Sequence, residues 1–267
     1  MSMGILAGKS AIVTGSTRGI GRAIALLFAK EGAAVVVHGM DQGRAVETVE
    51  AIQQAGGRAA YCLGDVADDG FGEQLASFCT AQFGRVDILV ANAGAVGLTP
   101  FLDMTPAMMR RALDVHVTGA FLTAQAAARC MIAGGNGGRI LFMGSVSSTQ
   151  AMYGYAAYSS AKAGMAALAR VAAIELAPHQ ITVNTIAPGP VQNEMMDQLW
   201  GPERLKDRCL GIPAGRLAQP EEVAQLALFL ASPAAAYITG QQHVLDGGAT
   251  AAGLYTHEIH KRASHSS

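Results

Sequence analysis

Charged residues are scarce in this sequence, and neither sign dominates. They make up 15% of the 267 residues, and 19 basic against 20 acidic side chains leave a formal net charge of −1. Proteins that bind nucleic acid or an anionic membrane surface carry a basic patch or stripe. The basic residues here are spread along the chain, so we expect neither a nucleic-acid partner nor a membrane partner.

Paired cysteines and long apolar runs are also missing. The cysteines form no CxxC pair, the first ten residues hold no long apolar run, and residues 165–177 are broken by Arg170 and Glu175. Signal peptides and membrane-spanning helices need longer uninterrupted runs, and disulfides need an oxidising compartment. We therefore expect a cytoplasmic protein with four reduced, buried cysteines: Cys62, Cys79, Cys130 and Cys209.

Hydrophobic residues make up 51% of the sequence. Along the chain, short apolar runs alternate with segments in which the apolar residues have helical spacing. The runs predict strands at 11–13, 34–37, 59–63, 86–91, 139–143, 181–186 and 243–245. The spacing predicts helices at 20–30, 44–55, 72–83, 106–132, 156–176 and 221–230. Strands that are apolar throughout are typical of a parallel sheet covered on both faces. We predict one Rossmann-type, doubly wound α/β domain over residues 1–248, with about seven parallel strands, and a partly disordered tail over 249–267.

A glycine-rich turn follows the first expected strand and leads into the first expected helix. It reads Thr14-Gly15-Ser16-Thr17-Arg18-Gly19-Ile20-Gly21, a GxxxGxG spacing. Glycines there allow close approach of the backbone to a pyrophosphate, and the helix N-terminus attracts the anion. This position favours a dinucleotide site over the alternative, a tight turn with no ligand.

Further motifs follow in order along the chain. They are Asp65-Val66, Ala91-Asn92-Ala93-Gly94, Ser145, Tyr158-x-x-x-Lys162 and Pro188-Gly189. Together with the glycine loop they resemble the short-chain dehydrogenase/reductase family, from Lys9 to Gly248. The resemblance implies strand order 3-2-1-4-5-6-7, a homotetramer, and a nicotinamide cofactor. The cofactor would contact Gly15, Ser16, Thr17, Arg18, Gly19, Ile20, Gly21, Gly39, Met40, Asp65, Val66, Asn92, Ala93, Gly94, Tyr158, Lys162, Pro188, Gly189, Val191 and Asn193.

The resemblance assigns catalysis to Ser145, Tyr158 and Lys162. Tyr158 and Lys162 are four residues apart in an expected helix, so their side chains share one face. A tyrosine with a pKa near ~10 is a poor base at neutral pH unless a nearby cation, here the ammonium of Lys162, stabilises its phenolate. Ser145 would hydrogen-bond the substrate oxygen where charge develops. Each residue by itself also has a non-catalytic interpretation. Tyr158 could be a surface tyrosine, Lys162 a solvated lysine and Ser145 a turn serine.

Two positions depart from the family pattern. His116 stands where the family has a catalytic asparagine, thought to hold a water in a proton relay from the lysine. Asn193 stands where a threonine near the nicotinamide carboxamide is usual. A histidine also binds water and passes protons, with a pKa near ~6.5. The relay then survives in altered form or is lost, or His116 has no role. If the relay is lost, the alternative is that the protein binds the cofactor in a regulatory or structural role, with altered or lost turnover.

The residues at the end of the second expected strand indicate whether the cofactor is NAD(H) or NADP(H). Gly39 stands where an acid would bind the ribose hydroxyls of NAD and repel a 2′-phosphate. Arg18 could pair with that phosphate. Two residues favour NAD(H) instead. Met40 stands where NADP-using relatives often have arginine, and Asp41 adds a negative charge nearby. We expect NADP(H) to be favoured, with NAD(H) as the alternative.

The loops expected around the substrate are mostly apolar. Besides Ser145, the candidates for substrate contact are Val96, Met152, Tyr155 and Met195, which suit a small to medium, partly apolar ketone or alcohol. Packing of a lid is the alternative role for these side chains. His257 and His260 lack a third ligand, so we expect no metal site. An alanine-rich helix face would suit close contact in a tetramer: Ala163, Ala166, Ala167 and Ala173.

Overall fold

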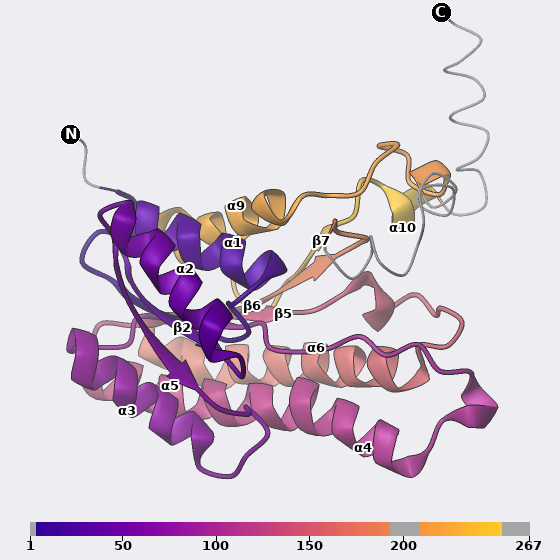
Figure 1. The fold of residues 1–267 in the computed structure, drawn as a ribbon, viewed down its shortest axis with the longest axis horizontal. Coiled ribbons are helices and arrows are strands. Elements are labelled where there is room, and N and C mark those ends of the chain that lie inside the picture. Colours follow the sequence, from indigo (N-terminus) through magenta and orange to yellow (C-terminus); the bar gives the residue numbers. More distant parts are fainter. Residues whose placement is uncertain (1–3, 193–208, 253–267) are drawn as a thin grey trace, which may run out of the picture.

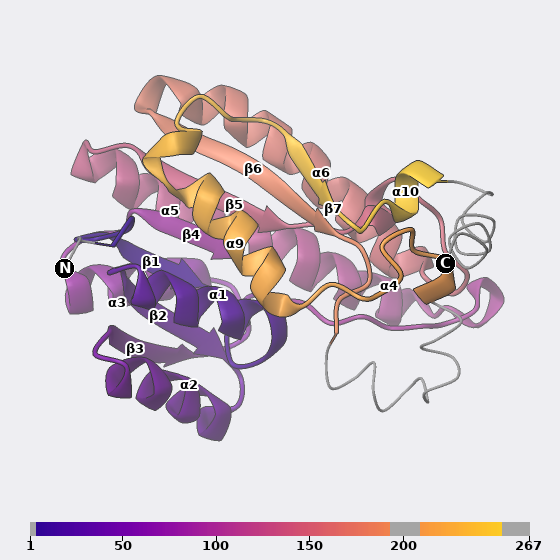
Figure 2. The same cartoon turned by 90° about the horizontal axis from the view of Figure 1, so that it is seen from above.

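The computed structural model describes residues 4–192 and 209–252. Its centre is a parallel sheet of seven strands (Figure 1). The strand order is β3-β2-β1-β4-β5-β6-β7, which confirms the expected order (Figure 2). The strands are β1 (Ser10–Val13), β2 (Ala34–Gly39), β3 (Arg58–Leu63), β4 (Ile88–Ala91), β5 (Gly138–Met143), β6 (Ile181–Pro188) and β7 (Gln242–Leu245).

Burial on both faces explains the unbroken apolar runs of the central strands. Every residue of β1, β2, β4 and β6 is buried. Within β2, Val35 and Val37 join the core on one face of the sheet, and Val36 joins the core on the other. Successive side chains of a strand point to opposite faces, so each must be apolar when both faces are covered.

Helices form one layer on each face of the sheet (Figures 1 and 2). One layer holds α1 (Gly19–Lys30), α2 (Gln42–Gln54) and α9 (Pro220–Ala231). The other layer holds α3 (Phe71–Phe83), α4 (Pro106–Leu113), α5 (Ala120–Gly134) and α6 (Ala156–Leu176). The observed bounds of α6 match the prediction, because its apolar spacing runs without interruption from end to end.

The helix expected over 106–132 is not continuous. A π-helical segment, Asp114–Gly119, separates α4 from α5 and carries His116. At Gly119 an added Cβ would lie 2.8 Å from the Val66 carbonyl oxygen, so the helix passes very close to the loop after β3. Short π segments occur mostly as bulges within α-helices, frequently at functional sites.

The alanine-rich face expected for subunit contact is not one face. Ala166 and Ala173 are buried in the protein's own core, whereas Ala163 and Ala167 are exposed. The spacing along the helix explains this difference. Ala166, Ala169 and Ala173 are at positions i, i+3 and i+7, so they lie on the face of α6 that packs on the sheet. The exposed face of α6 instead includes Val171 and Ile174, and Ile174 is 77% exposed.

The expected C-terminal tail begins with a short helix. Helix α10 (Ala249–Ala252) is held by Asp246, whose carboxylate accepts from the backbone N–H groups of Gly248 at 2.9 Å and Thr250 at 2.7 Å. The rest of the expected tail, 253–267, with His257 and His260, lies outside the described residues. In the part of the chain that the structure describes, no helix is long and apolar enough to cross a membrane.

Candidate active site

The sheet order reverses beside β1, which has β2 on one side and β4 on the other. In an open parallel sheet, loops leave this point in opposite directions and open a crevice at the carboxyl ends of the strands. The glycine loop leaves β1 there, and Asn92-Ala93-Gly94 leaves β4. Ser145 follows β5, and Pro188-Gly189 ends β6. The fold thus brings the predicted motifs to one edge of the sheet.

Asn92 fixes the glycine loop from the neighbouring strand. Its Nδ2 donates to the carbonyl oxygens of Thr14 at 2.9 Å and Gly15 at 3.0 Å. A Cβ on Gly15 would lie 2.9 Å from the Cα of Ala93, and one on Gly21 would lie 2.2 Å from the carbonyl oxygen of Gly15. Gly19, at φ +53°, has open space where a Cβ would be. A loop whose backbone is open at Gly19, with a helix starting directly behind it, fits a pyrophosphate.

His38 also holds this loop, and the sequence reasoning missed it. The N–H of Gly15 donates to His38 Nδ1 at 3.1 Å, and His38 Nε2 lies 3.0 Å from the carbonyl oxygen of Gly64. A carbonyl only accepts, so Nε2 carries the proton and the ring is neutral. Burial lowers the pKa of His38, although the contact with Gly64 opposes this. The sequence feature that could have indicated this role is a histidine that follows directly after the apolar run of the second strand.

The end of β2 has no acidic side chain at Gly39. A Cβ there would lie 2.6 Å from Thr17 Cγ2, so Thr17 occupies the space beside Gly39. The Met40 side chain is exposed. Asp41 caps α2 by accepting from the N–H of Arg44 at 3.1 Å, and its Oδ2 lies 3.8 Å from Arg44 Nε. The negative charge of Asp41 is therefore partly compensated within its own helix turn.

Asp65 is held at both carboxylate oxygens. The N–H of Ala67 donates to Oδ1 at 3.0 Å, and Arg111 Nη2 donates to Oδ2 at 2.5 Å. Burial alone would raise the pKa of Asp65, but the hydrogen bonds from Ala67 and Arg111 outweigh it and lower the pKa. Val66 is buried against Gly119, as described above. Arg111 is a second residue that the sequence reasoning missed.

Ser145, Tyr158 and Lys162 meet at the carboxyl end of β5. Lys162 is 4% exposed, and its Nζ donates to the carbonyl oxygen of Met143 at 2.5 Å. The same Nζ lies 5.6 Å from the centre of the Tyr158 ring. Ser145, 8% exposed, accepts from the N–H of Ser147 at 3.1 Å. The expected shared helix face of Tyr158 and Lys162 is thus present.

The ionisation of this group differs from the expectation. Burial lowers the pKa of Lys162 to about 7. Burial raises the pKa of Tyr158, although the hydroxyl of Ser145 acts in the opposite direction. We expected the ammonium of Lys162 to dominate and lower the pKa of the phenol. Withdrawal from water has the larger effect because it penalises the charged form of both groups.

His116 lies beside Tyr158 and is 3% exposed. Its ring packs edge-on against the Tyr158 ring, with centroids 5.4 Å apart at 84°. Nε2 lies 2.9 Å from the Ala95 carbonyl oxygen, so Nε2 carries the proton. Nδ1 has no hydrogen-bond partner among the described residues. A Cβ on Gly94 would lie 2.2 Å from His116 Cε1, so only glycine at 94 leaves room for this ring.

The environment of His116 keeps it neutral. Burial first, and then the charge of Lys162, lower its pKa to about 4, although the hydrogen bond with Ala95 acts in the opposite direction. A neutral imidazole with a proton on Nε2 presents one donor and one acceptor, as a carboxamide does. The expected ionisation near pH 6.5 is therefore absent from the pH range in which most enzymes work.

Two loops join at the mouth of the crevice. The N–H of Thr99 donates to the carbonyl oxygen of Gly154 at 2.9 Å. Val96, Leu98 and Tyr153 are exposed there, and the rings of Tyr155 and Tyr158 are 5.7 Å apart. The hydroxyl of Ser147 donates to the Sδ of Met152 at 3.7 Å. The candidate contacts Val96, Met152 and Tyr155 thus come from loops around Tyr158.

The remaining predicted residues divide into two groups. Pro188, Gly189 and Val191 are described, and the N–H of Gly189 donates to the Leu245 carbonyl oxygen at 2.8 Å. A Cβ on Gly189 would lie 2.8 Å from Asp246 Cβ, which explains the glycine. Asn193 and Met195 lie outside the described residues. Within 4–192 and 209–252, no three His, Cys, Asp or Glu residues gather as a metal site would require.

Comparison with known proteins agrees with this geometry. A sequence profile described as "Enoyl-(Acyl carrier protein) reductase" matches residues 15–250. The 7alpha-hydroxysteroid dehydrogenase of Escherichia coli (strain K12) is 40% identical over 243 residues, covering 91% of this chain and 94% of the relative. The chain belongs to the short-chain dehydrogenase/reductase family.

Other members of the short-chain dehydrogenase/reductase family are similar over the same length. The L-rhamnose 1-dehydrogenase (NAD(P)(+)) of Azotobacter vinelandii is 38% identical over 252 residues, covering 91% of this chain and 97% of the relative. A solved structure of 7 alpha-hydroxysteroid dehydrogenase complexed with NADH and 7-oxo glycochenodeoxycholic acid has a TM-score of 0.87. It is 40% identical and covers 91% of this chain and 94% of that chain. This protein is therefore an NAD(P)-dependent oxidoreductase that acts on alcohol or carbonyl groups.

Proposed function

We propose that this protein interconverts an alcohol and a ketone with Tyr158 as its general acid/base. The observation that carries the proposal is the meeting of Ser145, Tyr158 and Lys162 beside the glycine loop. The nicotinamide, when bound, supplies or accepts the hydride at the substrate carbon. Tyr158 gives a proton to, or takes one from, the substrate oxygen, and Ser145 hydrogen-bonds that oxygen.

The cofactor would be held by the residues named from the resemblance. Gly15 and Gly21 let the loop pack closely on Ala93 and on itself, and Gly19 leaves the backbone open for the pyrophosphate. Asp65 and Val66 would lie beside the adenine, as the resemblance to the family implies. Lys162, with a pKa of about 7, exchanges its proton near neutral pH. It would hold the nicotinamide ribose, as the resemblance to the family implies. His116 takes the place of the family asparagine as a neutral group, with Nδ1 free to accept from a water molecule.

The direct test is Tyr158→Phe, which removes only the phenolic oxygen. Loss of the acid/base should lower the turnover number by several orders of magnitude and leave the dissociation constant of the reduced cofactor within about twofold. Turnover is followed at the nicotinamide absorbance with a panel of ketones and alcohols, and binding by nicotinamide fluorescence. Retention of more than about a tenth of wild-type turnover would remove Tyr158 from this role. A wild-type protein that binds cofactor and turns over nothing would favour the regulatory alternative.

We further propose NADP(H) as the favoured cofactor. Gly39 presents no carboxylate to repel a 2′-phosphate, and Asp41 is engaged in capping α2. Arg18 is exposed in the glycine loop and forms no ion pair with another described residue. A guanidinium so placed suits a phosphate. NAD(H) is the alternative, and the NADH named with the solved 7 alpha-hydroxysteroid dehydrogenase belongs to that relative.

The proposed substrate is a small to medium, partly apolar ketone or alcohol. The described loops at the mouth, 94–102 and 145–158, contain no charged residue, and several of their apolar side chains are exposed. An apolar, uncharged rim suits an aliphatic or alicyclic body better than a sugar, which needs many hydrogen-bond partners. A matched panel of cyclohexanol, cyclohexanone and a free sugar separates these classes by kcat/KM.

We also propose a homotetramer. Val171 and Ile174 of α6, with Phe121 and Ile132 of α5, expose apolar surface on neighbouring helices. The edge strand β7 exposes Val244, and α9 exposes Phe229. Two separate apolar surfaces of this kind suit a dihedral tetramer. Sedimentation velocity of the wild type and of Ile174→Arg tests it, and a wild-type monomer would contradict it.

A further inference from the structure

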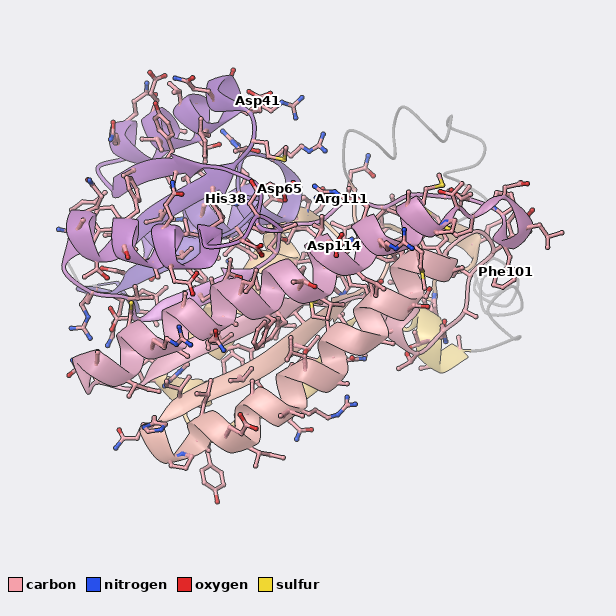
Figure 3. All side chains as sticks on the ribbon, turned by 90° about the horizontal axis from the view of Figure 1, so that it is seen from below. His38, Asp41, Asp65, Phe101, Arg111 and Asp114 are labelled. Atoms are coloured by element: carbon pink, nitrogen blue, oxygen red, sulfur yellow. The ribbon has the colours of Figure 1, made fainter. Side chains whose placement is uncertain are left out.

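The feature that the proposed mechanism leaves unexplained is the ion pair between Asp65 and Arg111 (Figure 3). Asp65 follows β3, whereas Arg111 comes from α4, 46 residues later in the chain. Arg111 is the more exposed partner, at 55% against 17% for the side chain of Asp65. The pair therefore joins the adenine end of the cofactor site to the helix that leads into the π segment.

The loop of Asp65 is restrained by contacts at both carboxylate oxygens and at the backbone of Val66. The N–H of Ala67 donates to one carboxylate oxygen, and Arg111 donates to the other. The backbone of Val66 lies against Gly119, too close for any side chain at that position. Each oxygen of an ionised carboxylate accepts about two hydrogen bonds, so one acceptor position on each oxygen stays available. These positions accept only, because no proton remains on the carboxylate.

This inference rests on the proposed function, in which Asp65 and Val66 lie beside the adenine. We propose that Arg111 is a positioning residue that holds the Asp65 carboxylate toward the exocyclic amino group of the adenine. The pair thereby selects adenine dinucleotides over dinucleotides whose purine has a carbonyl oxygen at that position. A carboxylate fixed there accepts from an amino group and repels a carbonyl oxygen. Without Arg111 the carboxylate turns toward water and discriminates less.

The chain offers a matched control in the neighbouring arginine. Arg110 lies on the same helix and has the same charge, and it forms no ion pair or hydrogen bond through its side chain within the described residues. Arg110→Gln and Arg111→Gln therefore change the net charge and the helix equally. Only Arg111→Gln removes the contact with Asp65. Any difference between the two variants reports the contact rather than the charge.

The experiment measures dissociation constants for NADPH and NADH and for their hypoxanthine counterparts, by nicotinamide fluorescence. Wild type and Arg110→Gln should prefer the adenine forms to the same degree. Arg111→Gln should bind the adenine forms about three- to tenfold more weakly and the hypoxanthine forms with unchanged affinity. Arg111→Lys keeps a cation without the planar fork and should fall between the two. Thermal melting of each variant checks folding, and Arg111→Lys decides the question if Arg111→Gln does not fold.

The possible results separate the two proposals. Equal weakening of adenine and hypoxanthine forms would make Arg111 a structural residue and overturn the inference. Identical behaviour of Arg110→Gln and Arg111→Gln would overturn it too, as would tighter binding of adenine forms by Arg111→Gln. A wild-type protein that binds none of the four dinucleotides would overturn the proposed function itself, and this inference with it.

Discussion

Replacing His116 with asparagine tests whether His116 is a buried, neutral ring that takes the place of the family's asparagine. From the sequence, a histidine in the relay predicts an ionisation near pH 6.5 in the activity profile. In the structure, burial and the charge of Lys162 lower the pKa of His116 to about 4. The variant restores the amide that the family uses, which also has a donor and an acceptor. The two proteins should then differ more in stability at acid pH than in activity.

The magnitude follows from the difference in pKa between the two states. A histidine in the unfolded chain has a pKa near ~6.5. Below that pH the unfolded chain binds a proton that the native protein does not, so stability falls as pH falls from 6.5 to about 4. Each unit corresponds to about 1.4 kcal/mol. The full loss from this one ring is therefore on the order of 3 kcal/mol, and it is complete below about pH 4.

The assay is urea unfolding of wild type and His116→Asn at several pH values between about 7.5 and 4.5. Relative to its own value at pH 7.5, wild type should lose roughly 2–3 kcal/mol more than the variant at pH 4.5. His38, whose pKa is also lowered, is present in both proteins, so the difference isolates His116. If the free energy of unfolding fell by the same amount with pH in both proteins, His116 would not be held as a buried neutral ring.

The activity profiles supply the second half of this test. Wild type and His116→Asn should share one pH dependence between about pH 5.5 and 7.5, because His116 stays neutral throughout that range. His116→Leu removes donor and acceptor together and should lower kcat more than it changes KM. An acidic limb near pH 6.5 that disappears in the asparagine variant would refute the lowered pKa. Full activity of the leucine variant would remove His116 from the relay.

Three further results follow from the same contacts. Lys162→Met should be inactive yet more stable than wild type at pH 7, by roughly 2–4 kcal/mol, because a buried lysine with a pKa of about 7 opposes folding below its unfolded pKa of ~10.4. That advantage should shrink as pH rises from 7 to 10 in urea unfolding, and a less stable variant would contradict it. Gly94→Ala should cost about 1–3 kcal/mol by displacing the His116 ring, and less in a His116→Ala background, which a double-mutant cycle measures. Arg18→Ala should weaken NADPH binding about ten- to a hundredfold and NADH binding much less, and equal losses would contradict the NADP(H) preference.

Much of the fold was readable from the sequence because local patterns decided it. Unbroken apolar strands required a sheet covered on both faces, and the bounds of α6 followed from its apolar spacing. The glycine loop was readable because its steric need is local, as Gly15 and Gly21 have no room for a side chain. Tyr158 and Lys162 share a face by helical geometry alone.

Other features depended on partners distant in the chain, which no local pattern reveals. Arg111 finds Asp65 only because the fold brings α4 beside the loop after β3. His38 holds Gly15 and Gly64 because three strand ends meet, and Ala166 points inward because of how α6 lies on the sheet. The pKa values of His116, Tyr158 and Lys162 were set by burial, which is a property of the packed molecule. The sequence by itself determined which groups can do chemistry here, and the tertiary structure decided their charge, because exclusion of water depends on every neighbour at once.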